Sequence, residues 1–471
     1  MNDCTNAITK LMNELTRREI NLHSVLITEN GKTLYEHYRA PFTAEMPHRM
    51  YSVTKSFVAM AIGSLIDEGK LKLTDRIVSF FPDKLPETLP REMAEQTVRN
   101  MLMMNTCLAG CNWFKPGVTD RTAFYFSQKP VRPAGTLFDY DSTGSYILGC
   151  LVERLSGMKL LDYMKLRFLD EIGGFENAEI LATPDGTPWG DSALICTTRA
   201  LERFARLLMN KGAWNGKQLI SRAYVEEATS FQSETGVNGT KSYNTYGYGY
   251  QIWMTREGGF SFHGMGGQHA IVLPEKGLIF TCTGDNQYNS DYGDRLYEAV
   301  INCLSPDFEN TENWPEQDKL SVAHGEKSSP FEKEVDGAWF VCGENPMGIT
   351  RFRVCFNENG GSFEYVNAQG EKKIDFGRKE NDFGLFPQYG YSDDRGNVHE
   401  ITDFLYKDAV SAGWIEQQKL QIWVQIIDRY FGSLMITIGW RDKDAAGVRM
   451  IKVAEDFMTE YSGWMGAYRE A

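Results

Sequence analysis

The sequence has no apolar run long enough to cross a bilayer, because polar residues interrupt its longest apolar stretches well before that length. Its first residues lack a basic segment followed by an apolar stretch, so no secretory signal is predicted. It has no basic excess either, since the formal net charge is −14 over 471 residues. We therefore expect a cytoplasmic protein that binds neither nucleic acid nor membrane.

Patterned metal ligands are also absent. The nine cysteines are scattered and form no Cys-x-x-Cys pair, and the seven histidines show no His-x-x-x-His spacing. Scattered thiols in a chain without a secretory signal are typical of reduced, mostly buried cysteines. We predict no metal site and no cofactor, so any chemistry must come from ordinary side chains.

The composition, with 42% hydrophobic residues, is sufficient for about two or three domains with their own cores. Asn30-Gly31 stands between two β-prone runs and predicts a hairpin. Helical patterns follow over much of the next 170 residues, while residues 107–135 have few periodic signals and are predicted to form a surface loop. From Tyr246 the pattern returns to strands, with a final helix near 295–304. Residues 1–310 therefore predict an α+β domain whose antiparallel sheet combines its first and last strands.

A second domain is predicted after a linker rich in Pro, Ser, Asn and charge, at 311–332. Residues 333–471 contain short β-type runs that favour an antiparallel barrel of lipocalin-like kind or, alternatively, a sandwich. These runs are 349–356, 361–366, 374–378, 420–427, 434–441 and 448–453. The domain is rich in tryptophan, but it contains no recognisable catalytic constellation.

Ser52 and Lys55 lie three residues apart where a helix is predicted to begin, so both side chains share one helical face. The pair serves catalysis only if Lys55 is neutral when Ser52 attacks. The apolar run that follows and the positive potential of the helix N-terminus both favour a neutral amine, and such an amine activates a serine. Taken alone, Ser-x-x-Lys often occurs by chance, with the serine as a helix cap and the lysine in solvent.

Two further motifs follow the pair in order, Tyr140-Asp141-Ser142 and the glycine-rich segment 263–268, His-Gly-Met-Gly-Gly-Gln. With these three motifs the chain resembles the β-lactamase and penicillin-binding-protein serine hydrolases over about residues 18–304. It looks most like the class C β-lactamase relatives, which include esterases, D-aminopeptidases and 6-aminohexanoate-dimer hydrolases. The resemblance implies a β-lactamase/transpeptidase-like fold, with an antiparallel sheet flanked by helices and a helical subdomain.

The resemblance also implies a role for each matching residue. Ser52 is the nucleophile that becomes acylated, and Lys55 is its proton partner. Tyr140 shares the proton with the lysine and delivers it to the leaving group. Without the resemblance to the family, Tyr140 would be interpreted as a packing residue where a helix begins. Ser142 orients the lysine or the substrate by hydrogen bonding.

The third motif departs from the family pattern Lys-Thr-Gly. Either Phe262-His263-Gly264 or His263-Gly264-Met265 occupies that place, and in both registers the lysine that binds a substrate carboxylate is missing. Because a buried carboxylate needs a charged partner, small esters and amides become the favoured substrates. The backbone N–H groups of Ser52 and of Met265 or Gly266, according to the register, are expected to bind the oxyanion.

These observations predict a serine hydrolase that cleaves a small ester, amide or peptide through an acyl-enzyme on Ser52. One alternative is β-lactamase or DD-peptidase activity. A second is a penicillin-binding or sensor protein that acylates without turnover. A third places the main function in the C-terminal barrel, with a ligand held inside it.

Overall fold

The computed structural model describes residues 2–110, 118–183, 186–236, 242–303, 319–389, 405–428, 431–453 and 461–470. They form two compact units, one within Met1–Asp318 and the other within Lys319–Ala471. None of the helices in these ranges is long and apolar enough to cross a membrane. The cysteines from Cys107 onward in these ranges are free thiols.

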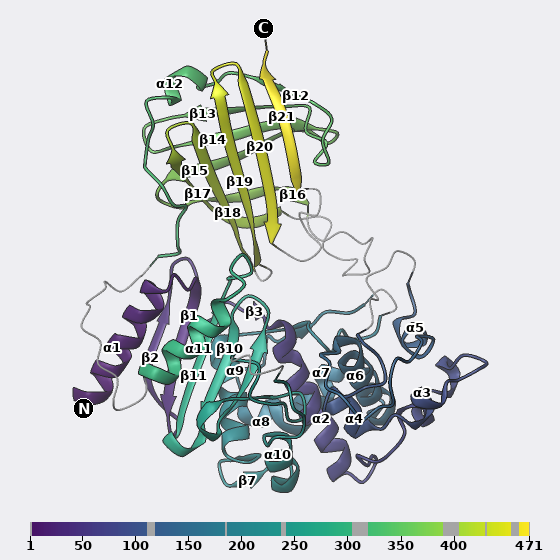
Figure 1. The fold of residues 1–471 in the computed structure, drawn as a ribbon. Coiled ribbons are helices and arrows are strands. Elements are labelled where there is room, and N and C mark those ends of the chain that lie inside the picture. Colours follow the sequence, from purple (N-terminus) through teal and green to yellow (C-terminus); the bar gives the residue numbers. More distant parts are fainter. Residues whose placement is uncertain are drawn as a thin grey trace. The chain divides into compact units, whose positions relative to one another are not determined.

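The first unit is built on a six-stranded antiparallel sheet in the order β2-β1-β11-β10-β9-β8 (Figure 1). The strands are β1 Leu22–Glu29, β2 Lys32–Tyr38, β8 Trp253–Met254, β9 Phe260–Gly264, β10 Gln268–Leu273 and β11 Leu278–Gly284. β1 pairs with β11, so the predicted union of first and last strands is confirmed. The predicted hairpin is confirmed too, because Asn30 and Gly31 both have positive φ (49° and 81°), as the tight turn between β1 and β2 requires.

Helices cover both faces of this sheet. Val25 and Ile27 of β1 share a buried core with α1 (Asn2–Arg17) and α11 (Tyr292–Cys303). The alternate residues Ser24 and Thr28 hydrogen-bond to Thr198 and Glu202 of α9 (Thr198–Met209), which therefore packs on the opposite face.

A helical part surrounds α2 (Thr54–Asp67), which follows a 3₁₀ turn at Tyr51–Val53. Residues 54–65 are all buried, including the polar residues Lys55 and Ser56, and α2 packs against α6 (Ser142–Ser156). The other helices are α3 Arg91–Glu95, α4 Val98–Leu102, α5 Arg121–Phe126, α7 Leu160–Met164, α8 Asp170–Ile172 and α10 Arg222–Ala228. Short strands complete the unit: β3 His48–Arg49, β4 Glu179–Ile180, β5 Leu194–Cys196, β6 Ala213–Trp214 and β7 Lys217–Gln218.

The helix α5 corrects the prediction of a loop over 107–135. Its N-cap is Asp120, whose carboxylate accepts a hydrogen bond from the Ala123 N–H at 2.9 Å. A helix of six residues is too short to give a periodic signal, so the cap was the only local cue. Residues 111–117, with the aromatic pair Trp113 and Phe114, lie outside the described residues.

Three phenylalanines hold α2, α9 and the sheet together. The rings of Phe57 in α2 and Phe204 in α9 stack with centroids 3.6 Å apart. The Phe204 ring also lies 5.4 Å from Phe262 in β9. This contact fixes the position of β9 relative to the start of α2, where Ser52 is found.

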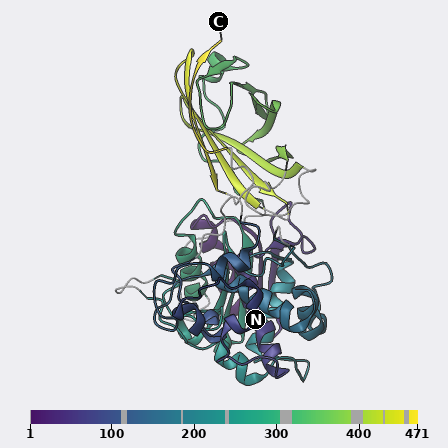
Figure 2. The ribbon, with the colours of Figure 1, turned by 90° about the vertical axis from the view of Figure 1, so that its right-hand side faces the viewer.

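The second unit is a closed β-barrel, which confirms the barrel prediction and excludes a sandwich (Figures 1 and 2). Nine strands form the ring in the order β15-β14-β13-β12-β21-β20-β19-β18-β17, closed by a parallel pairing of β15 with β17, and β16 pairs with β17 as well. The strands are β12 Phe340–Cys342, β13 Arg351–Phe356, β14 Gly360–Asn367, β15 Gly370–Arg378, β16 Asp382–Tyr389, β17 Leu405–Glu416, β18 Lys419–Ile427, β19 Phe431–Asp442, β20 Ala445–Val453 and β21 Gly463–Arg469.

Part of the predicted linker packs onto the barrel. Leu320 and Ala323 are buried, and Glu326 forms a β-bridge with Trp414 of β17. The short helix α12 (Glu332–Val335) follows directly. A polar composition therefore did not distinguish a free linker from an irregular segment that covers a barrel.

Candidate active site

Ser52 lies in the middle of the 3₁₀ turn that leads into α2 and is half-buried. The residue before it, Tyr51, is buried and adopts φ = +46°, a left-handed conformation that is unfavourable for a bulky residue. The Met50 N–H donates to the Leu194 carbonyl at 2.7 Å and the Val53 N–H donates to the Met50 carbonyl at 3.2 Å, so hydrogen bonds anchor the turn. Such locally strained backbone is frequent at functional sites.

Lys55 turns back toward Ser52. Its Nζ lies 2.9 Å from Ser52 Oγ and 2.7 Å from the backbone carbonyl oxygen of Asp191, and its side chain is 1% exposed. An Asp191 carboxylate oxygen lies 3.9 Å from the same nitrogen. The structure thus brings the half-buried Ser52 into direct contact with the buried Lys55.

Tyr140 lies next to this pair, immediately before α6. Lys55 Nζ is 5.2 Å from the centroid of the Tyr140 ring. The ring stacks on Trp253, with centroids 5.6 Å apart and planes at 14°, and meets the edge of Tyr248. The Tyr140 hydroxyl has no hydrogen-bond partner within the described residues, so it is available to a substrate.

Asp141 fixes the point where α6 begins and thereby the position of Tyr140. Its buried carboxylate accepts hydrogen bonds from the Thr143 and Gly144 N–H groups and from the Thr143 and Thr106 hydroxyls. Burial raises the pKa of Asp141, and these hydrogen bonds oppose the increase. The Ser142 hydroxyl, at the first position of α6, makes no hydrogen bond within the part of the chain that the structure describes.

β9 brings the third motif to the Ser52 turn, and Gly264 lies so close to Met50 that a side chain has no room. Phe262 points toward α9. His263 points the other way: its Nε2 lies 2.8 Å from Ser261 Oγ and 2.6 Å from the Tyr297 hydroxyl, and its ring stacks on Trp253. Burial lowers the pKa of His263, so this imidazole is neutral and cannot replace the missing lysine as a cation.

Two backbone N–H groups remain without an acceptor where the motifs meet. Within the described residues, neither the Ser52 nor the Met265 N–H has a hydrogen-bond partner. Burial raises the pKa of Tyr292, and the nearby Gly266 backbone opposes that increase. The two registers of the third motif assign the second N–H donor to Met265 or to Gly266.

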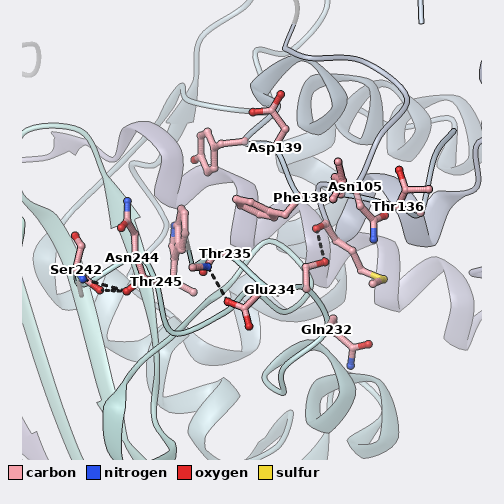
Figure 3. Close-up of a pocket in the computed structure, with 17 residues that line it drawn as sticks. Asn105, Thr136, Phe138, Asp139, Gln232, Glu234, Thr235, Ser242, Asn244 and Thr245 are labelled. Carbon is pink, nitrogen blue, oxygen red and sulfur yellow. Dashed lines mark hydrogen bonds between the residues drawn. The ribbon is translucent and has the colours of Figure 1, made fainter. Parts of the chain in front are cut away.

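A cleft of about 990 Å³ adjoins the site, with Tyr140 and Trp253 among its lining residues. Figure 3 shows Phe138 and Asp139 above Gln232 and Glu234 in that view. The remaining lining is mostly uncharged: Met103, Asn105, Gly135, Thr136, Leu137, Ser233, Thr235, Gly236, Ser242, Asn244 and Thr245. Among these residues no lysine or arginine is present to bind a carboxylate.

Several predicted site residues thus meet in space, namely Ser52, Lys55, Tyr140, Gly264 and Met265. Ser142 lies at the start of α6 without a contact to the pair, and the His263 side chain is separated from Tyr140 by Trp253. Sequence reasoning missed Trp253 and Asp191. Neither belongs to one of the three motifs, and Asp191 is 136 residues from Lys55 in the sequence, so no local pattern could have found it.

Comparisons with known proteins identify the family of the first unit. The model of the Beta-lactamase family matches residues 8–301. The 6-aminohexanoate-dimer hydrolase of Paenarthrobacter ureafaciens is 23% identical over 272 residues, which cover 53% of this chain and 69% of that protein. The chain therefore belongs to the Beta-lactamase family.

Two solved structures share the fold. A protein from Bacillus anthracis, provisionally assigned as a 6-aminohexanoate-dimer hydrolase, has a TM-score of 0.53 at 20% identity, over 62% of this chain and 82% of its own. The octameric penicillin-binding protein homologue from Pyrococcus abyssi has a TM-score of 0.50 at 16% identity, over 98% of this chain and 100% of its own. At these identities the likeness concerns the fold alone.

Proposed function

We propose that this protein is a serine hydrolase that cleaves small esters or amides through an acyl-enzyme on Ser52. The observation that carries the proposal is the 2.9 Å contact between Ser52 Oγ and Lys55 Nζ in a buried site. A lysine amine held against a serine hydroxyl and shielded from water is a recognised way to activate the serine as a nucleophile.

The acylation step follows from this contact. Ser52 Oγ attacks the substrate carbonyl carbon, its proton passes to Lys55 Nζ, and the carbonyl electron pair moves onto the oxygen. The N–H groups of Ser52 and Met265 bind that oxyanion, which favours the register Phe262-His263-Gly264 for the third motif. As the bond from the carbonyl carbon to the leaving group breaks, Tyr140 gives its proton to the departing alcohol or amine and takes the proton held by Lys55 in its place. Water then attacks the ester on Ser52 and gives a proton to Lys55, and that proton returns to Ser52 Oγ as the acid leaves.

The cleft supports an uncharged or weakly polar substrate. Its aromatic wall and mostly uncharged polar lining suit a small acyl or amide group, and among the described lining residues a carboxylate would meet Asp139 and Glu234 but no lysine or arginine. The neutral state of His263 supports the same conclusion. β-Lactams and peptides with a terminal carboxylate are therefore disfavoured as substrates.

A covalent probe tests the proposal. After incubation with a fluorophosphonate or an activated ester, intact-protein mass spectrometry should show one adduct, mapped to Ser52 and lost in Ser52→Ala. Ser64→Ala is the matched control, because Ser64 is a buried serine of α2 whose hydroxyl donates to the Met60 carbonyl, and its adduct should persist. Absence of any adduct with all acylating probes would contradict the proposal.

Turnover separates the remaining alternatives. The proposed enzyme should release more than one equivalent of nitrophenol per protein from nitrophenyl esters and should leave cephalosporins largely intact. A single equivalent followed by a stable adduct would identify a sensor that acylates without turnover. Faster reaction with cephalosporins than with esters would instead identify a β-lactamase.

A further inference from the structure

Asp191 is a buried carboxylate beside the proposed base. It lies in the loop that leads into β5, and the residue is 4% exposed. Its backbone carbonyl accepts the 2.7 Å hydrogen bond from Lys55, and its Oδ2 lies 3.9 Å from the same nitrogen. Its Oδ1 is buried without a hydrogen-bond partner in the described part of the chain. A buried carboxylate oxygen without a hydrogen-bond partner destabilises the folded state unless nearby positive charges stabilise it.

Two buried arginines provide part of that compensation. Arg49 of β3 and Arg121 of α5 are both fully buried, and their guanidinium groups lie 4.7 Å and 5.4 Å from the ring of Trp189. Burial raises the pKa of Asp191, while Lys55, Arg121, the Ser192 hydroxyl and Arg49 oppose that increase. Each arginine thus favours the ionised carboxylate, against the burial that raises its pKa.

During acylation, the charge among these buried groups changes at one atom, the Lys55 nitrogen. When Lys55 takes the proton of Ser52, an ammonium forms in a site where its side chain is 1% exposed. The groups that face this nitrogen are the Ser52 hydroxyl, the ring of Tyr140 and Asp191. Of these three groups, Asp191 is the one that carries a carboxylate. A new buried charge is stabilised chiefly by an opposite charge close to it, as the aspartate of a Ser-His-Asp triad stabilises its imidazolium.

We propose that the Asp191 carboxylate is a positioning residue for acylation, which orients Lys55 toward Ser52 and stabilises the ammonium formed when Lys55 accepts the proton. The proposal rests on the proposed function. Asp191 itself neither gains nor loses a proton or a bond in the step. The backbone carbonyl and the carboxylate of one residue thus act together on the same nitrogen.

The test is Asp191→Asn in the full chain, which keeps the backbone carbonyl and the side-chain size but removes the charge. With p-nitrophenyl acetate as the probe, kcat/KM at its plateau should fall about 10- to 100-fold. The acid limb of the pH profile of kcat/KM should move to lower pH, because without the carboxylate the neutral amine persists at lower pH. Glu202→Gln is the matched control, since it neutralises another buried carboxyl group, bonded to Thr28, and should leave the limb in place.

If Asp191→Asn folds and the acid limb of its pH profile of kcat/KM does not move, the proposal is overturned, even if the rate falls. If that variant does not fold, Asp191→Ser, which is smaller and uncharged, should show the same shift. Failure of both uncharged variants to fold while Asp191→Glu folds would assign Asp191 a structural role and overturn the proposal as well. Activity that survives in Ser52→Ala would instead reject the proposed function itself, so the two failures are distinguishable.

Discussion

A Cβ atom at Gly264 would stand 2.2 Å from the carbonyl oxygen of Met50. Met50 is two residues before Ser52, and Gly264 directly precedes Met265, whose N–H is the second donor of the proposed oxyanion site. The absence of a side chain at position 264 therefore sets the separation between the two N–H groups at Ser52 and Met265. Glycine is needed here for close backbone approach and not for an unusual dihedral angle.

Gly264→Ala should separate these two N–H groups while the fold persists. The alanine methyl has to push β9 or the Ser52 turn away, and a small misplacement of an oxyanion donor is costly. We expect kcat/KM for esters to fall by about 10-fold to 100-fold, with an unchanged circular dichroism spectrum. Gly447→Ala is the control, because a Cβ there meets nothing within 4 Å. Wild-type activity of Gly264→Ala would contradict the proposed oxyanion site.

Lys55→Arg tests whether Lys55 is the base that takes the proton of Ser52. Arginine can still donate a hydrogen bond to Ser52, but it is always protonated and cannot accept a proton from Ser52. The rate of covalent labelling at Ser52, followed by mass spectrometry, should fall by about 10²- to 10⁴-fold. Lys70→Arg, at a lysine whose side chain is 46% exposed, should label at the wild-type rate. Equal labelling of both variants would remove Lys55 from the mechanism.

The core of this site could be predicted from the sequence because its determinants are local. Ser52 and Lys55 are three residues apart, and Tyr140 precedes a helix that begins with its own cap, Asp141. The hairpin at Asn30-Gly31 was predictable for the same reason, since the turn residues themselves require positive φ. In each case the residues that determine the geometry are sequence neighbours.

The remainder depends on contacts between distant segments, which one sequence does not reveal. Asp191 contacts Lys55 although the two residues are 136 positions apart, and no local sequence signal indicated the left-handed conformation of Tyr51. The register of the third motif stayed open because it depends on how β9 meets the Ser52 turn, and these two segments lie far apart in the sequence. The helix α5 was not predicted, because its six residues are too few to show a helical period in the sequence.

Tyr140→Phe removes the hydroxyl group of Tyr140 and keeps its aromatic ring, so this variant separates the effects of the two groups. The ring packing on Trp253 should survive, but the hydroxyl that delivers a proton to the leaving group is lost. An amine leaving group needs that proton, whereas nitrophenolate leaves without it. We therefore expect kcat/KM for an anilide to fall about 10²- to 10⁴-fold and that for the matching nitrophenyl ester to fall clearly less. Equal losses for both substrates would contradict a role in leaving-group protonation.

Phe57→Ala should destabilise the first unit. The Phe57 side chain is fully buried and stacks on Phe204 at 3.6 Å, so its removal leaves a cavity between α2 and α9. The free energy of unfolding of this unit, from denaturant titration of the full chain, should fall by about 3–5 kcal/mol. Phe231→Ala is the control, because that side chain is 55% exposed and should cost about 0.5 kcal/mol or less. A similar effect of both variants would argue against the packing described.

Asp408 should make the stability of the barrel depend on pH. Burial in β17, helped by the charges of Asp382 and Asp375, raises the pKa of Asp408 to about 7 from an ordinary value of 3.8. Between these two pH values the folded barrel binds more protons than the unfolded chain, so its stability falls as the pH rises and reaches a constant lower level above about pH 7. The carboxylate thus destabilises the barrel at neutral pH by roughly 2–4 kcal/mol.

Asp408→Asn should remove this dependence, because the amide is neutral at every pH and can still accept a hydrogen bond from the Gly384 N–H. Hydrogen exchange of peptides from β17 and β18 in the full chain measures the effect. Exchange in the wild type should become faster between pH 4 and pH 7 beyond the intrinsic chemical rate, whereas the variant should show only the intrinsic change. Asp444→Asn, at an exposed carboxylate of the same unit, should behave like the wild type. A wild-type barrel whose protection does not change over this range would show that Asp408 titrates at its ordinary pKa.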